Sequence, residues 1–316
     1  MKLQTQIPLQ SEPYNQIDYH SKIVLLGSCF AENIGEKFNY YKFQHLQNPF
    51  GILFHPLAIE QLITNAINEN EYQEQDIFFH NEQWHCFDAH SKLSDASKGS
   101  FLNTLNNQIL LTSSFIKSCS HVIITLGTAW VYRHIESDSL VANCHKVPQK
   151  QFEKELLTVD QITESLEAIR VMLKSVNPKV SIIFTVSPVR HLKDGFIANS
   201  QSKAHLISAI HNVVEPRNQS YYFPSYEIML DELRDYRFYK DDMIHPNNLA
   251  IEYIWKKFQD VWISKEANST LKEIEAIQKG LDHKPFNPNS ESYQEFLEEL
   301  KTKQQKVQEV YSHIIF

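Results

Sequence analysis

Glycine is scarce in this chain, since only 7 of its 316 residues are Gly. That is about 2% of the chain, where average usage is roughly 7%. A sequence that uses so few glycines is expected to keep them for positions where no side chain fits. Three of the seven, Gly27, Gly51 and Gly127, stand at or just after the ends of predicted strands. We therefore expect the functional segments to lie near these strand ends.

Basic residues are outnumbered, and long apolar runs are missing. The chain has 30 Lys and Arg against 38 Asp and Glu, a net charge of −8. Because phosphate binding usually needs a basic surface, this balance argues against nucleic acid as a partner. No apolar run approaches the ~18 residues that span a bilayer, so we expect no membrane protein and no membrane partner. The N-terminal run MKLQTQIPLQSEPYNQ lacks an apolar core and a small-residue cleavage site, which predicts no secretory signal.

Cysteine is also sparse, and its spacing excludes a simple disulfide framework. The four cysteines, Cys29, Cys86, Cys119 and Cys144, are far apart and form no CxxC pair. Free thiols in a reducing cytoplasm are the expected state for a chain of this size, so we expect a cytoplasmic protein. With 42% hydrophobic and 22% charged residues, the sequence is that of a folded globular protein rather than a disordered one.

Short apolar runs alternate with helical patterns along most of the chain. We predict buried strands at 22–27, 43–47, 121–127, 179–187 and 221–223, and helices at 31–41, 55–67, 161–176, 202–214, 225–233 and 249–262. This alternation is typical of a parallel sheet with helices on both faces. Two segments, 76–98 and 130–152, break the alternation and are expected to form hairpins or loops near the strand ends, where they would wall a binding site.

The chain changes character after residue 264. Two charged, helix-rich stretches joined by KPFNPN follow, and we expect them to form two helices that pack on the core or on a partner. The predicted organisation is therefore a domain over 1–264 and a helical extension over 265–316. The extension could support a homo-oligomer.

Two short segments carry candidate chemistry. Ser28 follows Gly27 where a strand turns into a helix, a position that exposes a nucleophile to a helix N-terminus. A serine there is equally a good helix cap. Asp242 and His245 lie three residues apart in DMIHP, so the carboxylate could hold the imidazole by Nδ1 and leave Nε2 as a base. A surface loop with a capping Asp is the alternative for this segment.

Together the segments resemble a known family. The run GSCFA at 27–31 is similar to the pentapeptide after which the GSCFA family is named, within the SGNH/GDSL hydrolase superfamily. Further matching stretches, over about residues 20–260, are NPFGILFHP (48–56), TLGTAWVY (125–132), NCHKVP (143–148), SPVRHLKDG (187–195) and DELRDYRFYKDDMIHP (231–246). The resemblance implies a flavodoxin-like three-layer α/β/α sandwich with a mostly parallel sheet. It also implies an esterase or acyltransferase activity that needs no metal and no cofactor.

By this resemblance, Ser28 corresponds to the nucleophile, His245 to the general base and Asp242 to the carboxylate that orients it. The Ser28 amide and the amide of Gly51 would donate to the oxyanion, and the missing Cβ of Gly51 would let a carbonyl approach closely. The superfamily's third donor is an Asn, but here Ala129 stands in its place. Thr128 and Asn143 are the expected replacements, and Arg190 is the next candidate.

Other polar residues have competing interpretations. Cys29 is expected to pack rather than react. Arg190 and His191 follow a strand end, where they would contact substrate or form a structural ion pair. Tyr132 is a further substrate-binding candidate, beside Trp130 and Phe54, which we expect to pack in the wall of the site. A zinc set would need His85, Cys86, His90, Cys144 and His145, but no pair among them has the spacing of a structural site, so we expect no metal.

These observations predict a serine esterase or acyltransferase that works through an acyl-enzyme. A small-molecule or carbohydrate ester is the expected substrate, with acetylated carbohydrates as candidates. The alternative is a catalytically weak binding or scaffold protein on the same fold, which the missing Asn favours. The retention of Ser28, Asp242 and His245 together favours the enzyme.

Overall fold

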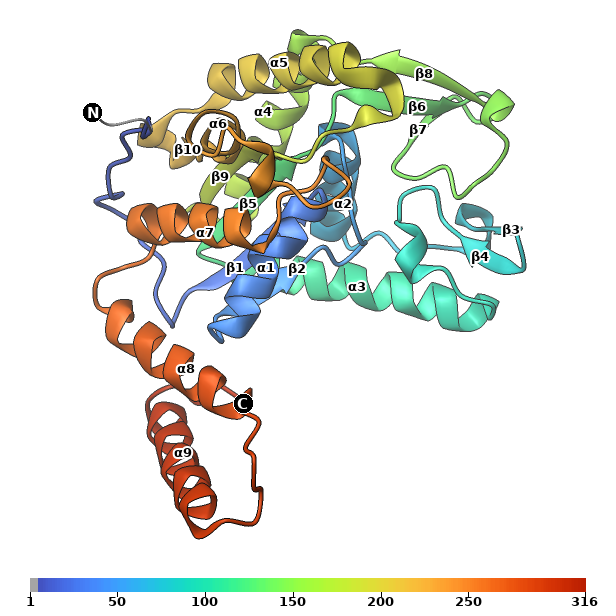
Figure 1. Cartoon of the computed structure of the whole chain (residues 1–316). Coiled ribbons are helices and arrows are strands. Elements are labelled where there is room, and N and C mark those ends of the chain that lie inside the picture. The colour runs from blue at the N-terminus through green and yellow to red at the C-terminus, as the bar shows by residue number, and fades with distance from the viewer. Residues whose placement is uncertain (1–4) are drawn as a thin grey trace.

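The computed structural model describes residues 5–316, and its elements follow the predicted alternation (Figure 1). In chain order they are β1 (Lys22–Gly27), α1 (Cys29–Tyr40), β2 (Gln44–Gln47), α2 (Pro56–Asn68), β3 (Phe78–His80), β4 (Gln83–His85), α3 (Lys98–Ser118), β5 (His121–Leu126), β6 (Trp130–His134), β7 (Ser139–Val141), β8 (Phe152–Leu156), α4 (Val159–Val176), β9 (Ser181–Val186), α5 (Gly195–Val213), β10 (Ser220–Tyr222), α6 (Ser225–Glu227), α7 (Asn248–Trp262), α8 (Ala267–Leu281) and α9 (Glu291–Val310).

The central sheet has the strand order β2-β1-β5-β9-β10, and every neighbouring pair is parallel. Counted along the sheet's own strands this is the order 2-1-3-4-5 of flavodoxin-like folds. The predicted fold class is therefore confirmed. Because all strands point the same way, the residues that follow β1, β5 and β9 meet at one edge of the sheet, where such folds bind their ligands.

The two faces of the sheet carry separate apolar cores. Along β1, Val24 and Leu26 join a core made with α2, α3, α4 and α5, whereas Ile23 and Leu25 join one made with α1, α7 and α8. This alternation follows from the period of two along a strand. Figure 1 shows α4 and α5 on one side of the sheet and α1 and α7 on the other. The helices that flank the sheet therefore complete three layers.

Two small antiparallel sheets interrupt the alternation, as predicted for 76–98 and 130–152. Strands β3 and β4 form a hairpin, and β6 pairs with both β7 and β8. The inserts touch each other, because the rings of His85 and His145 lie 4.6 Å apart between centroids. Both inserts lie on the same side of the molecule in Figure 1.

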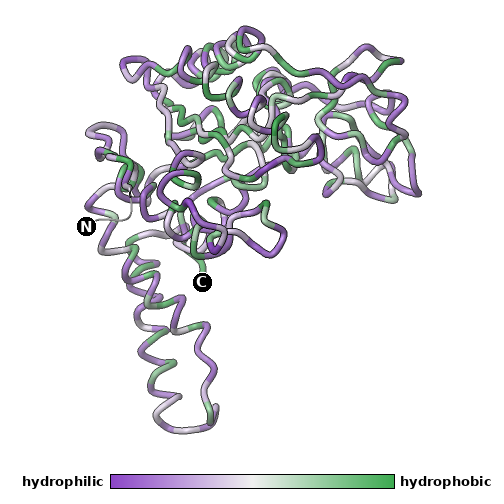
Figure 2. Tube along the Cα trace, turned by 45° about the horizontal axis from the view of Figure 1, so that its top comes forward, coloured by the Kyte–Doolittle hydropathy of each residue, from purple (hydrophilic) through white to green (hydrophobic). Residues whose placement is uncertain are grey.

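The C-terminal helices form a hairpin that leaves the body of the protein (Figures 1 and 2). Helix α8 packs its apolar stripe, including Leu271 and Ile274, on the core that contains α1 and α7. Helix α9 then packs on α8 with Leu300, whose side chain lies over Gly280. The expected helices are thus present, and the first of them packs on the core of the same chain.

Some expected elements differ from the structure. The helix expected at 225–233 is one short turn, α6, followed by a π-helical turn over 228–232. Helix α5 starts at Gly195, seven residues before the expected start, and its first turns bury Asn199 while Phe196 and Ile197 are exposed. The prediction that the N-terminal run carries no secretory signal includes residues 1–4, which lie outside the described residues. Within residues 5–316, no helix combines the length and apolar character needed to cross a membrane.

Candidate active site

Ser28 is fixed at the junction between β1 and α1. Gly27 has φ +130°, and a Cβ there would lie 2.1 Å from the carbonyl oxygen of Thr125, so the position needs glycine. Ser28 caps α1, its amide donates to Thr125 O at 3.0 Å, and its Oγ accepts from the amide of Phe30 at 3.3 Å. The residue is fully buried. The serine is therefore a helix cap, and its oxygen also lies at the edge of the sheet where folds of this kind bind their ligands.

Asp242 and His245 form the predicted pair. Oδ2 of Asp242 lies 2.7 Å from Nδ1 of His245, while Oδ1 accepts the backbone amides of Ile244 and His245 at 2.8 and 2.9 Å. These amides, with the imidazole, lower the pKa of Asp242 to about 2, so the carboxylate is ionised at neutral pH. The hydrogen bond to Asp242 orients the ring and leaves Nε2 of His245 as the nitrogen that can accept a proton.

His191 lies close to Ser28. A Cβ added to Gly127 would lie 3.1 Å from Nε2 of His191 and 3.2 Å from Cβ of Ser28, so both side chains border the same place. Burial, with Lys203 and His245 as neighbouring titratable groups, lowers the pKa of His191 to about 3. The ends of β1, β5 and β9 thus bring Ser28, Gly127 and His191 together. The amide of Arg190 donates to Ile244 O at 3.4 Å, which places the segment of His245 at the same edge. Among residues 5–316, no hydrogen bond joins Ser28 to His245.

The predicted oxyanion donors already have other partners. The amide of Gly51 donates to Asn48 O at 2.7 Å, and the Ser28 amide is held by Thr125. Gly51 has φ +71°, and its missing Cβ makes room for the side chain of His90, which a Cβ would approach to 2.4 Å. We expected that space to admit a substrate carbonyl, but His90 occupies it.

The candidates for the third donor are engaged elsewhere as well. The Thr128 amide donates to Phe54 O at 3.0 Å, and its hydroxyl lies 3.0 Å from Ser202 Oγ. Asn143 lies in the insert, where its amide donates to Phe87 O at 3.3 Å and its Oδ1 accepts the amide of His145 at 2.8 Å. The Ala129 amide donates to Ser202 Oγ at 2.7 Å.

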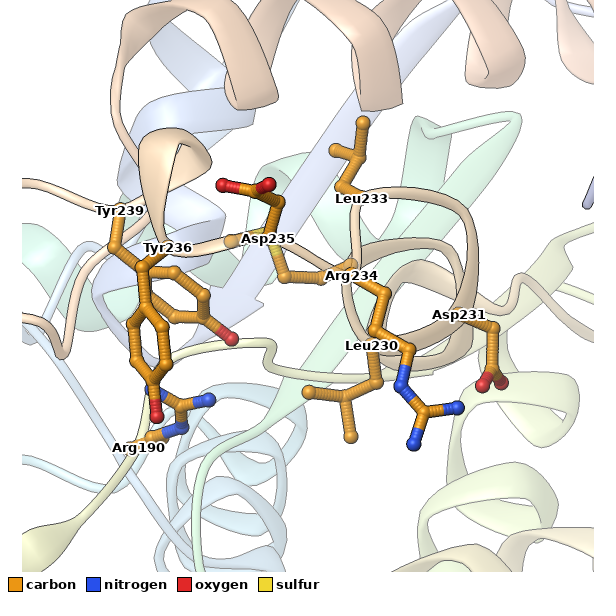
Figure 3. Close-up of a pocket in the computed structure, with 9 residues that line it drawn as sticks. Arg190, Leu230, Asp231, Leu233, Arg234, Asp235, Tyr236 and Tyr239 are labelled. Carbon is orange, nitrogen blue, oxygen red and sulfur yellow. The ribbon is translucent and has the colours of Figure 1, made fainter. Parts of the chain in front are cut away.

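Arg190 holds the segment that carries His245. Its guanidinium donates to Met243 O at 2.9 Å and lies over the ring of Tyr239, with its centre 4.2 Å from the ring centroid. Figure 3 shows Arg190 beside Tyr236 and Tyr239 at the wall of a cavity of about 410 Å³, to which Arg234 and two Asp side chains also contribute. Instead of an ion pair, Arg190 makes a contact with the backbone.

Tyr132 lies farther out, on β6, where its hydroxyl accepts from Lys193 Nζ at 3.4 Å. Cys29 packs against the core that contains α1, and burial raises the pKa of its thiol, which keeps the sulfur protonated. Both side chains therefore make packing or polar contacts that need no substrate.

The candidate zinc residues bind other parts of the protein. His85 bonds to Ser94 and to the carbonyl of His80, and His145 bonds to Ser91 and to the carbonyl of Cys86. In the part of the chain that the structure describes, no group of three or more His, Cys, Asp or Glu side chains is placed to hold a metal ion.

Lys203 is a site residue that the sequence analysis missed. Its ammonium is buried on α5 and donates to the carbonyls of Gly127 and Ser187, each at 2.7 Å. Burial lowers its pKa to about 7. The sequence pattern that could have indicated its burial is its place in the apolar stripe of α5, three residues before Leu206 and seven before Ile210.

Comparison with known sequences identifies the family. The sequence model of the GSCFA family matches residues 22–258, and that of the GSCFA domain protein, C-terminal domain, matches 274–316. The chain belongs to the GSCFA family. No curated protein matches it.

Several solved structures are similar to this GSCFA chain at low identity. One is a carbohydrate esterase family 3 protein from Talaromyces cellulolyticus, at 9% identity and TM-score 0.37, covering 81% of this chain and 99% of that one. Another is a mutant of an acetyl esterase with an acetate ion, at 10% and 0.37 with the same coverage. A third is the acetyl xylan esterase Est2A from the rumen bacterium Butyrivibrio proteoclasticus, at 11% and 0.39, covering 77% and 64%.

Proposed function

We propose that this GSCFA protein is a serine esterase or acyltransferase of the SGNH type. The observation that carries the proposal is the hydrogen bond between Asp242 and His245, on a segment that Arg190 ties to the sheet edge where Ser28 caps α1. A nucleophile, a base and a carboxylate that orients the base are the groups that acyl transfer requires.

In the proposed reaction, Ser28 Oγ attacks an ester carbonyl while Nε2 of His245 takes the serine proton. Asp242 stabilises the imidazolium that forms. His245 then returns the proton to the leaving alcohol, and water or an acceptor alcohol resolves the acyl-enzyme. Because no hydrogen bond joins Ser28 to His245 within residues 5–316, the proposed step requires Ser28 Oγ and His245 Nε2 to come together when substrate binds. Catalytic hydrogen bonds often tighten only in the complex.

The proposed acyl group is short. A carbon atom at the Cβ position of Gly127 would lie 3.1–3.2 Å from three atoms: Ser28 Cβ, His191 Nε2 and Phe54 O. Contacts this close leave no room for a long acyl chain at this place, so we propose a short acyl group such as acetyl. Acetylated carbohydrates are therefore our candidate substrates.

Labelling with a fluorophosphonate, followed by peptide mapping, tests the proposal. The wild-type protein should be labelled at Ser28, and Ser28→Ala should not be labelled at all. A chelator should not change the labelling. Label on another serine, or none in the folded wild-type protein, would contradict the proposal. The absence of label would favour the binding or scaffold alternative, for which the occupied amides of Ser28 and Gly51 are the supporting observation.

A further inference from the structure

The side chain of His191 has an unsatisfied nitrogen at the centre of the site. Its Nε2 is buried and has no hydrogen-bond partner within the described residues. The ring is nevertheless fixed, because its edge packs on Phe54 with centroids 5.1 Å apart and planes at 85°. Its backbone amide donates to Asn199 Oδ1 at 2.9 Å. A buried polar atom that the fold holds without a partner is unfavourable unless a ligand supplies one.

This nitrogen faces the serine across a space that glycine leaves open. The Cβ position of Gly127 is 3.1 Å from His191 Nε2 and 3.2 Å from Ser28 Cβ. Phe54 O also borders this space, but it already accepts the amides of Gly127 and Thr128. Among the groups around this space, Nε2 is therefore the polar one without a partner.

A neutral ring that carries its proton on Nε2 is the state that an oxyanion donor needs. Burial, with Lys203 and His245 nearby, lowers the pKa of His191 to about 3, so the ring is neutral at physiological pH. A neutral imidazole carries one N–H and can donate it without a change of protonation, as neutral imidazoles do in other enzymes. In its protonated form, the amine of Lys203, bonded to Gly127 O, adds a favourable positive potential on the same side.

We infer that Nε2–H of His191 donates a hydrogen bond to the oxyanion formed on the substrate, in the place left by the Asn that this chain replaces with Ala129. The inference rests on the proposed function. When Ser28 Oγ bonds to the carbonyl carbon, the C=O π electrons move to the oxygen and the serine proton moves to His245. His191 keeps its own proton and stabilises the negative oxygen.

Three variants test this role by their kinetics with p-nitrophenyl acetate. His191→Ala should lower kcat on the order of 10²–10³-fold with little change in KM, because the bond strengthens only in the transition state. His191→Gln, whose amide can donate, should lose less. His283→Gln, an exposed histidine on the C-terminal hairpin, should keep wild-type kinetics. If His191 were instead the base, His191→Gln would be as inactive as His191→Ala, and this result would overturn the inference.

A spectroscopic readout on the wild-type protein avoids any folding defect of the variants. With the fluorophosphonate bound to Ser28, the phosphonyl oxygen stands where the oxyanion would form. We expect ¹⁵N NMR to show a proton on Nε2 of His191 that moves downfield on labelling. A proton on Nδ1 in the labelled protein would overturn the inference. Wild-type protein that neither labels nor hydrolyses would overturn the proposed function itself, whereas full activity in His191→Ala would overturn only the role of His191.

Discussion

Lys203 Nζ lies 2.7 Å from the carbonyl oxygen of Gly127, the residue that separates Ser28 from His191. A second bond, to Ser187 O, ties the end of β5 to the end of β9. This buried amine thus fixes the two strand ends on which the site is built. A cation here is costly to bury, which is why its pKa falls from 10.5 to about 7.

The first prediction concerns the pH dependence of stability through Lys203. The folded protein binds fewer protons at this amine than the unfolded chain does between pH 7 and 10.5. The destabilisation by burial is therefore complete below pH about 7 and is relieved as the pH rises toward 10.5. Relative to Lys203→Met, the unfolding free energy of the wild-type protein should rise by up to ~1.4 kcal/mol per pH unit.

Urea unfolding at pH 7, 8 and 9 measures this difference. Lys179→Met, at an exposed lysine, is the matched control and should follow the wild-type protein. A wild-type minus Lys203→Met difference that does not vary with pH would contradict the titration of Lys203 in this range.

The second prediction concerns Asp242. In Asp242→Asn, the side-chain oxygen can still accept the amides of Ile244 and His245, so the turn should keep its fold. The neutral side chain cannot stabilise an imidazolium, and kcat should fall on the order of 10⁴-fold.

The pH profile of the wild-type protein supplies a second check on Asp242. The folded pKa of Asp242, about 2, lies below its ordinary 3.8, so the stability it adds is present above pH 3.8 and is lost as the pH falls toward 2. Asp242 therefore stays ionised between pH 9 and 4, and its titration should cause no loss of kcat in that range. An Asp242→Asn protein with wild-type kcat would exclude the pair from the mechanism.

The elements that could be predicted from the sequence are those with a simple apolar period. Strand β1 and strand β5 are continuous apolar runs that end near glycine, and α4 has a clear amphipathic stripe and a terminating Asn-Pro. Helix α3 gives a weaker signal because two of its buried positions, Thr112 and Ser113, are polar. Thr112 can be buried because its hydroxyl donates to the carbonyl of Gln108 within the helix.

The features of the candidate site also differ in whether the sequence could predict them. The Asp242–His245 pair is local in sequence, so the three-residue spacing was enough to predict its hydrogen bond. The state of an amide such as Gly51 N–H depends on a turn that brings Asn48 O within 2.7 Å, which residue types do not specify. The burial of Nε2 of His191 depends on Phe54 and Gly127, from two other strand ends, and so becomes visible only in three dimensions.

The third prediction separates the capping role of Ser28 from its proposed nucleophilic role. Ser28→Ala should destabilise the protein by ~0.5–2 kcal/mol, because Phe30 N–H loses its acceptor, whereas glycine at an N-cap costs only a few tenths. Both Ser28→Ala and Ser28→Gly should nevertheless lack esterase activity. Thermal unfolding and p-nitrophenyl acetate hydrolysis measure the two effects. Residual wild-type activity in the more stable Ser28→Gly would exclude Ser28 as the nucleophile.

The fourth prediction addresses Arg190, which we expect to position His245 rather than to bind substrate. Arg190→Lys keeps the charge but loses the planar group that covers Tyr239 and reaches Met243 O. A displaced His245 should lower kcat by about 10–100-fold with a small change in KM. If KM rises instead and kcat is unchanged, Arg190 contacts the substrate directly, as its place at the cavity in Figure 3 would also allow.

The last prediction tests the space between Ser28 and His191. Gly127 does not have a left-handed backbone, so alanine is compatible with its conformation, but the added Cβ would meet Ser28 Cβ, His191 Nε2 and Phe54 O at 3.1–3.2 Å. The methyl group would occupy the position that we assign to the acyl carbonyl. Gly127→Ala should therefore fold with a modest loss of stability and lose most of its kcat for p-nitrophenyl acetate. Gly99→Ala, where an added Cβ meets nothing within 4 Å, is the matched control and should keep its activity. Full activity in a folded Gly127→Ala would mean that the acyl group binds elsewhere, because a carbonyl and this methyl group cannot share the space.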